Sequence, residues 1–110
     1  MPRGNEPRIS YQGLKVLKAF LDAHQANVRS RLAGADIMRA AKIASGTLYP
    51  LLMRFEESKI LESAWEAQRP EDLGRPRRRL YRLTGQGATF ARKALEEVSV
   101  GFGTPVSNEG

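Results

Sequence analysis

Residues 32–56 read LAGADIMRAAKIASGTLYPLLMRFE, and two short helical patterns follow one another in this segment. The first covers residues 32–41 and has Ile37, Ala40 and Ala41 on its apolar side. Residues 42–44 form a tight connection, and Ser45 opens the second pattern. The apolar stripe of the second pattern recurs at helical spacing: Leu48, Leu51, Leu52 and Phe55. Two short helices joined by a few residues make a helix-turn-helix, so the sequence predicts this motif.

The second helix of this motif has an outer face opposite its apolar stripe. Gly46, Pro50, Met53 and Glu57 lie on that face, and it is flanked by Thr47, Tyr49 and Arg54. A purely structural, buried helix is the alternative, and the three flanking side chains argue against it. A proline several residues into a helix removes a hydrogen bond. We therefore expect a tight first turn or a late helix start near Thr47.

The elements on either side complete the predicted fold. Ser10 is a good N-cap for a first helix that ends near His24. Strand patterns cover residues 60–66 and 77–83, with a Pro- and Gly-containing loop at 68–76 between them. Thr84 caps a last helix that runs to residue 98. The prediction is a mainly α (α+β) fold, a winged helix-turn-helix with a two-stranded β wing.

The chain divides into four predicted parts. Residues 1–9 form a flexible N-terminal arm, residues 10–83 the winged helix-turn-helix, residues 84–98 a C-terminal helix and residues 99–110 a disordered tail. Trp65 is expected to pack its strand against the core, and a tryptophan that faces a ligand or partner is the alternative.

Positive charge is concentrated in the second strand of the wing. The 110 residues include 18 Lys and Arg against 12 Asp and Glu, a net charge of +6. Five of those charges come from eight positions without an acidic residue: Arg75, Arg77, Arg78, Arg79 and Arg82. Arginine has a planar fork of donors that suits phosphate. We therefore expect a basic wing that binds phosphate, and the alternative is a basic strand that is only solvated.

Other functional classes are disfavoured by composition. The chain has no cysteine and one histidine, which excludes disulfides, thiolate metal sites and a multi-histidine metal site within one chain. Gly85 and Gly87 begin a helix, but the third glycine of a dinucleotide-binding turn is replaced by Phe90. No constellation of acid, base and nucleophile emerges, so we expect neither an enzyme nor a cofactor. Without a long apolar run or an N-terminal signal pattern, we expect no membrane contact and a cytoplasmic protein.

Two long motifs resemble the PadR-like family of winged-helix transcriptional regulators. One is the segment of residues 45–56, SGTLYPLLMRFE, and the other is the segment of residues 74–84, GRPRRRLYRLT. With Trp65 and Glu66 before the loop, the likeness covers residues 12–98. The resemblance implies DNA contacts from both motifs: Ser45, Thr47, Tyr49, Pro50, Arg54, Arg75, Arg77, Arg78 and Arg79.

The resemblance also implies a homodimeric bacterial or archaeal regulator, usually a repressor, found at the nucleoid when bound. Members dimerise largely through a C-terminal helix and often respond to a small ligand, whose identity the sequence does not give. Here that helix is short, and we expect the longer effector domain of many relatives to be absent. The apolar residues expected at the dimer contact come from the first and last helices: Val16, Phe20, Phe90, Ala94 and Leu95. Lys59 replaces the family's usual Gly after the recognition helix, at a cost of about 1 kcal/mol if that backbone is left-handed.

The combined prediction is a transcriptional regulator that binds double-stranded DNA. A recognition helix would lie in the major groove of a pseudo-palindromic operator, and the Arg-rich wing would lie on the phosphate backbone. The alternatives are a winged-helix module for protein–protein interaction and a winged helix that binds RNA.

Overall fold

The computed structural model describes residues 9–101, with side chains up to residue 98. The predicted arm, apart from Ile9, and the predicted tail beyond Gly101 lie outside the described residues. The first helix, α1, spans Tyr11–Ala26. The Oγ of Ser10 accepts a hydrogen bond from the Gly13 N–H at 3.0 Å, which confirms the predicted N-cap.

The central helix-turn-helix is confirmed, and its helices are α2, Gly34–Ala41, and α3, Ser45–Glu57. Lys42 turns the chain between them with a left-handed backbone, φ 55°. The late start of α3 near Thr47 is wrong, because the helix begins at Ser45 and contains Pro50. Its first turn is tight, since the N–H groups of Thr47 and Leu48 both donate to the carbonyl of Ala44, at 3.1 and 2.9 Å.

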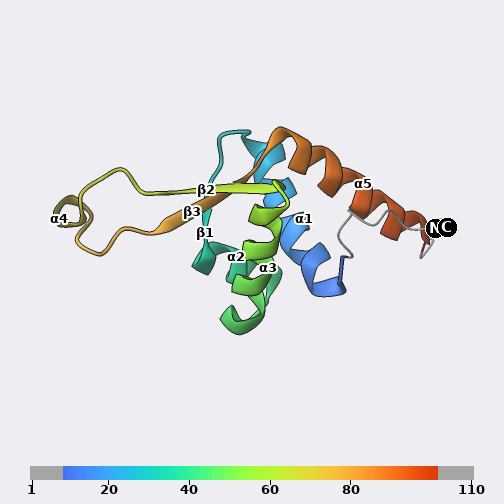
Figure 1. The fold of residues 1–110 in the computed structure, drawn as a ribbon, viewed down its shortest axis with the longest axis horizontal. Coiled ribbons are helices and arrows are strands. Elements are labelled where there is room, and N and C mark those ends of the chain that lie inside the picture. Colours follow the sequence, from blue (N-terminus) through green and yellow to red (C-terminus); the bar gives the residue numbers. More distant parts are fainter. Residues whose placement is uncertain (1–8, 102–110) are drawn as a thin grey trace.

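The sheet has three antiparallel strands instead of the predicted two. They are β1, Leu32–Ala33, β2, Leu61–Trp65, and β3, Arg79–Leu83, with β3 in the middle. Leu32 was expected in a helix but pairs with Tyr81. The loop between β2 and β3 contains a short helix, α4, Pro70–Leu73. We call β2, α4 and β3 with their connections, residues 61–83, the hairpin; it extends away from the helices with α4 at its tip (Figure 1).

The last helix, α5, spans Gly85–Gly101 and lies on the opposite side of the molecule from the tip of the hairpin (Figure 1). The Oγ1 of Thr84 accepts from the Gly87 N–H at 2.9 Å, as expected of a cap. Lys59 has φ 66°, so the position where Gly was expected from the family does need a left-handed backbone.

The core joins α1, α2, α3, the sheet and the start of α5. Val16 and Phe20 lie inside it, with exposed fractions of 0% and 2%. They were predicted to meet a second protomer, and this prediction is wrong, because they pack within their own chain. Phe90 and Leu95 are partly buried against the same core. No helix within residues 9–101 combines the length and the apolar character needed to cross a bilayer.

Candidate nucleic-acid interface

One side of α3 builds the core and the other side faces solvent. Leu48, Leu51, Leu52 and Phe55 are buried, as the periodicity predicts. The residues predicted to contact DNA from this helix are all exposed: Ser45, Thr47, Tyr49, Pro50 and Arg54. This arrangement excludes the alternative of a fully buried helix.

Tyr49 connects the outer face of α3 to the start of α2. Tyr49 remains 46% exposed, yet its hydroxyl lies so close to Gly34 that a Cβ on Gly34 would overlap it. Beside it is a hollow of about 260 Å³ whose other walls are the N-terminal turn of α2 and the hairpin residues Arg78, Arg79 and Tyr81. Burial, followed by the negative charge of Glu56, raises the pKa of Tyr81. The helix α3 and the hairpin therefore meet in one continuous surface.

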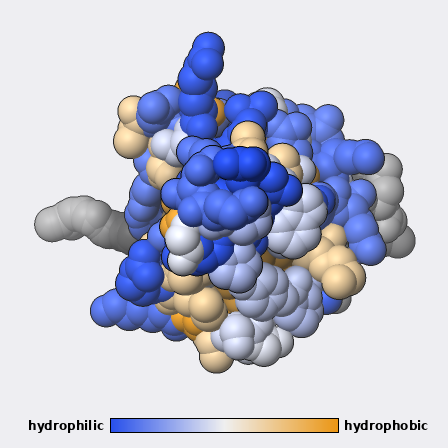
Figure 2. Space-filling view, turned by 90° about the vertical axis from the view of Figure 1, so that its left-hand side faces the viewer, coloured by the Kyte–Doolittle hydropathy of each residue, from blue (hydrophilic) through white to orange (hydrophobic). Residues whose placement is uncertain are grey.

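Figure 2 views the molecule along the hairpin from its tip. The hydrophilic surface of the hairpin occupies the centre of this face, and paler and orange residues lie below it. In Figure 1, α2 and α3 lie below the hairpin in the same vertical direction. The hydrophilic hairpin therefore stands next to the side of the molecule that holds α3, where Tyr49 and Met53 are exposed.

Glu66 holds the two sides of the hairpin together just beyond the strands, where the loop that contains α4 begins. Its two carboxylate oxygens accept from the guanidinium of Arg75 at 2.7 and 3.0 Å. Its Oε1 also accepts from the backbone N–H of Arg78 at 2.9 Å. The hydrogen bonds from Arg75, followed by the backbone bond, lower the pKa of Glu66 to about 2. The same contact raises the pKa of Arg75, so Arg75 stabilises the hairpin.

The five arginines between Arg75 and Arg82 are partly neutralised by acidic residues elsewhere in the chain. Glu56, Glu62 and Glu66 come from segments distant in sequence and pair with three of them. Arg82 pairs with Glu62 across the strands. Arg79 donates to Ser63 Oγ at 2.9 Å and lies 3.8 Å from the Glu56 carboxylate.

Arg77 and Arg78 are exposed, whereas Arg69, the other exposed arginine of the hairpin, forms an ion pair with Asp72 at 3.4 Å. Arg77 donates from Nε to the carbonyl of Gln68 at 2.8 Å. In the part of the chain that the structure describes, neither guanidinium has a carboxylate partner within salt-bridge distance. Within the hairpin, the positive charge available to an external anion is therefore concentrated at these two residues.

Trp65 does not pack against the core, so the preferred sequence interpretation is wrong. It is 59% exposed, and the guanidinium of Arg79 lies over its ring, 5.3 Å from the centroid. Leu61, which begins the same strand, is buried. β2 therefore begins in the core at Leu61 and ends outside it at Trp65, because the hairpin projects into solvent.

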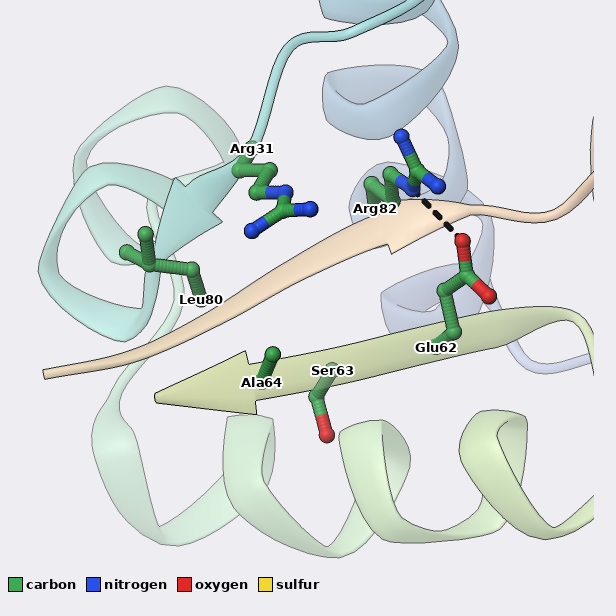
Figure 3. A pocket seen from close by; sticks show the side chains of 6 residues that line it. All are labelled: Arg31, Glu62, Ser63, Ala64, Leu80 and Arg82. Atoms are coloured by element: carbon green, nitrogen blue, oxygen red, sulfur yellow. Dashed lines mark hydrogen bonds and ion pairs between the residues drawn. The ribbon is translucent and has the colours of Figure 1, made fainter. Parts of the chain in front are cut away.

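The opposite face of the sheet has a second hollow of about 190 Å³. Figure 3 shows Glu62 and Arg82 on that face near Arg31, whereas Ser63 points toward α3. Glu62 already binds Arg82 there. Among the described residues, no group of three His, Asp or Glu side chains could hold a metal ion.

The fold and this surface define a winged helix-turn-helix protein. A model of the Transcriptional regulator PadR-like family matches residues 14–93, and the chain belongs to this family. No match was found among curated proteins.

Solved structures share the fold. A PadR-like transcription factor from Bacteroides fragilis is 26% identical, with a TM-score of 0.56, and the alignment covers 84% of this chain and 92% of that one. The Streptococcus mutans protein smu.1704 is also 26% identical, with a TM-score of 0.62 and coverage of 86% and 83%. MepR of Staphylococcus aureus, solved as a complex with DNA, has a TM-score of 0.62 at 20% identity and coverage of 84% and 66%.

Proposed function

We propose that this regulator binds duplex DNA as a homodimer and acts as a repressor. In this proposal α3 enters the major groove, where Ser45, Thr47, Tyr49, Pro50 and Arg54 lie along the DNA. Arg77 and Arg78 contact the phosphate backbone, and Arg75 and Arg79 position the hairpin.

One observation carries the proposal: α3 and the arginine-bearing hairpin border the same hollow. A helix that contacts bases and a basic wing that contacts phosphates must act on one duplex, so they must share a surface. Membership of a family of transcriptional regulators supports this function. The MepR–DNA complex supports it by analogy of fold.

The test removes the side chains of Arg77 and Arg78. In the double variant Arg77→Ala/Arg78→Ala, affinity for duplex should fall. The slope of log K against log salt should become shallower by about 4, since the dimer loses two phosphate contacts per protomer and each contributes about 0.9. The measurement is fluorescence anisotropy of a labelled duplex over a series of salt concentrations.

A matched control changes the same formal charge elsewhere. Lys18→Ala/Arg29→Ala removes two exposed cations from α1 and the turn that follows it, and should leave the slope unchanged. Equal slopes for wild type and the hairpin variant would contradict the proposed role of the wing.

A winged-helix module for protein interaction is the second candidate. It is favoured by the internal pairing of Arg75, Arg79 and Arg82, which leaves fewer cations for phosphate than the sequence indicates. A gel shift on random duplex at low salt separates the two, because such a module would not retard DNA.

A further inference from the structure

Trp65, the single tryptophan of the chain, is a large exposed side chain that the proposed function leaves unused. It lies at the end of β2, on the face that turns toward α3. On that face Leu61 is buried, and Ser63 donates to Glu56 in the last turn of α3 at 2.6 Å. Trp65 therefore lies on the same side of the sheet as α3.

The ring of Trp65 is held in place by its cross-strand partner. Arg79 pairs with Trp65 in the register of the sheet and covers the ring at 5.3 Å. Arg79 is itself fixed by Ser63 Oγ at 2.9 Å and by Glu56 at 3.8 Å. A cation over an indole face is an attractive contact, so the ring is oriented while Trp65 remains 59% exposed.

Two other large side chains are exposed on α3, the helix proposed to face DNA. Tyr49 is 46% exposed and Met53 63% exposed, and they lie one helical turn apart on the outer face of α3. Arg79, whose guanidinium lies over the Trp65 ring, also lines the hollow beside Tyr49. Trp65 therefore lies between the helix and the open cations Arg77 and Arg78.

We propose that Trp65 is a contact to the sugar–phosphate backbone of duplex DNA, between the contacts of α3 and those of the hairpin tip. This inference rests on the proposed function. An indole offers an apolar face that can pack on a deoxyribose and one N–H that can donate to a phosphate oxygen. In this arrangement Arg79 is a positioning residue that presents the ring.

A contact of this kind reads no base and carries no charge. Its loss should weaken binding to every duplex alike and leave the salt dependence unchanged, in contrast to the loss of Arg77 and Arg78. These two properties separate Trp65 from a base-reading residue and from a cation.

The experiment uses the whole chain and a short duplex of random sequence at low ionic strength. In the wild type, saturating duplex should change the fluorescence of Trp65, a measurement that needs no variant. Trp65→Ala should lower the affinity for duplex, measured by fluorescence anisotropy, by about tenfold. This is the size expected for lost packing and one lost hydrogen bond. Trp65→Phe keeps a ring but loses the N–H donor, and should lie between wild type and Trp65→Ala.

The chain contains a matched control. Tyr11 is 74% exposed and has Lys15 over its ring at 5.4 Å, but it lies at the start of α1. Tyr11→Ala should bind duplex like the wild type. Thermal unfolding of all variants, followed by circular dichroism, shows whether a loss of affinity is a loss of folding.

The inference is overturned if wild-type binding leaves Trp65 fluorescence unchanged, or if Trp65→Ala binds as tightly as Tyr11→Ala. It is also overturned if folded Trp65→Ala alters the salt slope. A wild type that binds no duplex at all contradicts the proposed function itself, and this result is distinct from the others.

Discussion

Gly87 lies in the first turn of α5, against the backbone of the turn that joins α3 to β2. A Cβ at this position would overlap the carbonyl oxygen of Ile60. That carbonyl also accepts the Thr84 N–H at 3.1 Å, just before the helix starts. Because two backbone segments meet here, neither can move apart without breaking the hydrogen bonds of Thr84, which caps α5. We therefore expect Gly87→Ala to destabilise the fold by at least about 2 kcal/mol.

Gly85 provides the control for this substitution, since it lies in the same turn and a Cβ on it would meet nothing within 4 Å. Gly85→Ala should be neutral or stabilise the protein by up to about 1 kcal/mol. Urea unfolding of both variants measures the difference. Similar unfolding midpoints for the two variants would show that the close approach of Gly87 to the Ile60 carbonyl does not require glycine.

At the scale of one element, the hairpin should be sensitive to acid through Glu66. Arg75 and the Arg78 N–H lower the pKa of this carboxyl to about 2 in the folded protein, from 4.5. A group whose folded pKa is depressed stabilises the fold above its unfolded pKa and loses that contribution as pH falls toward the folded pKa. Wild type should therefore lose hairpin stability between about pH 4.5 and 2.

Glu66→Gln should lower the thermal midpoint at neutral pH and show a smaller loss below pH 4.5. Unfolding followed by the fluorescence of the adjacent Trp65 is the measurement. Glu71→Gln, at the exposed tip in α4, is the control and should follow the wild type. Parallel curves for wild type and Glu66→Gln would argue against the Glu66 contacts as a source of stability.

The elements of this fold differ in how far sequence alone predicts them. The helix-turn-helix was predictable because helical periodicity is local, as in the stripe from Leu48 to Phe55. Leu32 was assigned to a helix because its pairing with Tyr81 joins residues far apart in the chain. Trp65 shares a strand face with Leu61, but alternation does not indicate where a strand leaves the core.

The same limit applies to charges and to apolar faces. Glu56, Glu62 and Glu66 neutralise part of the arginine cluster only through the register of the hairpin and its packing on α3. Val16 and Phe20 form an apolar face of α1, and a sequence does not distinguish burial within a chain from burial between chains. The structure assigns that face to the protomer's own core.

At the scale of the whole molecule, the proposed dimer has a geometric consequence. One protomer presents one copy of α3, and a two-fold axis would present two copies to one side of a duplex. With Val16 and Phe20 buried, the proposed contact is reduced to α5, where Phe90, Ala94 and Leu95 retain partial exposure. A contact of this size should make the dimer dependent on concentration.

We therefore expect sedimentation to detect a monomer–dimer equilibrium that duplex DNA shifts toward the dimer. Selection of bound duplexes from a random library should yield inverted half-sites about 34–36 Å apart, one helical turn or a multiple of it. Ala94→Asp places a charge in the proposed contact and should shift the equilibrium to monomer, while Thr89→Asp, on the exposed side of α5, should not. Selected duplexes with a single unrepeated site, or equal effects of the two substitutions, would contradict a dimer built on this face of α5.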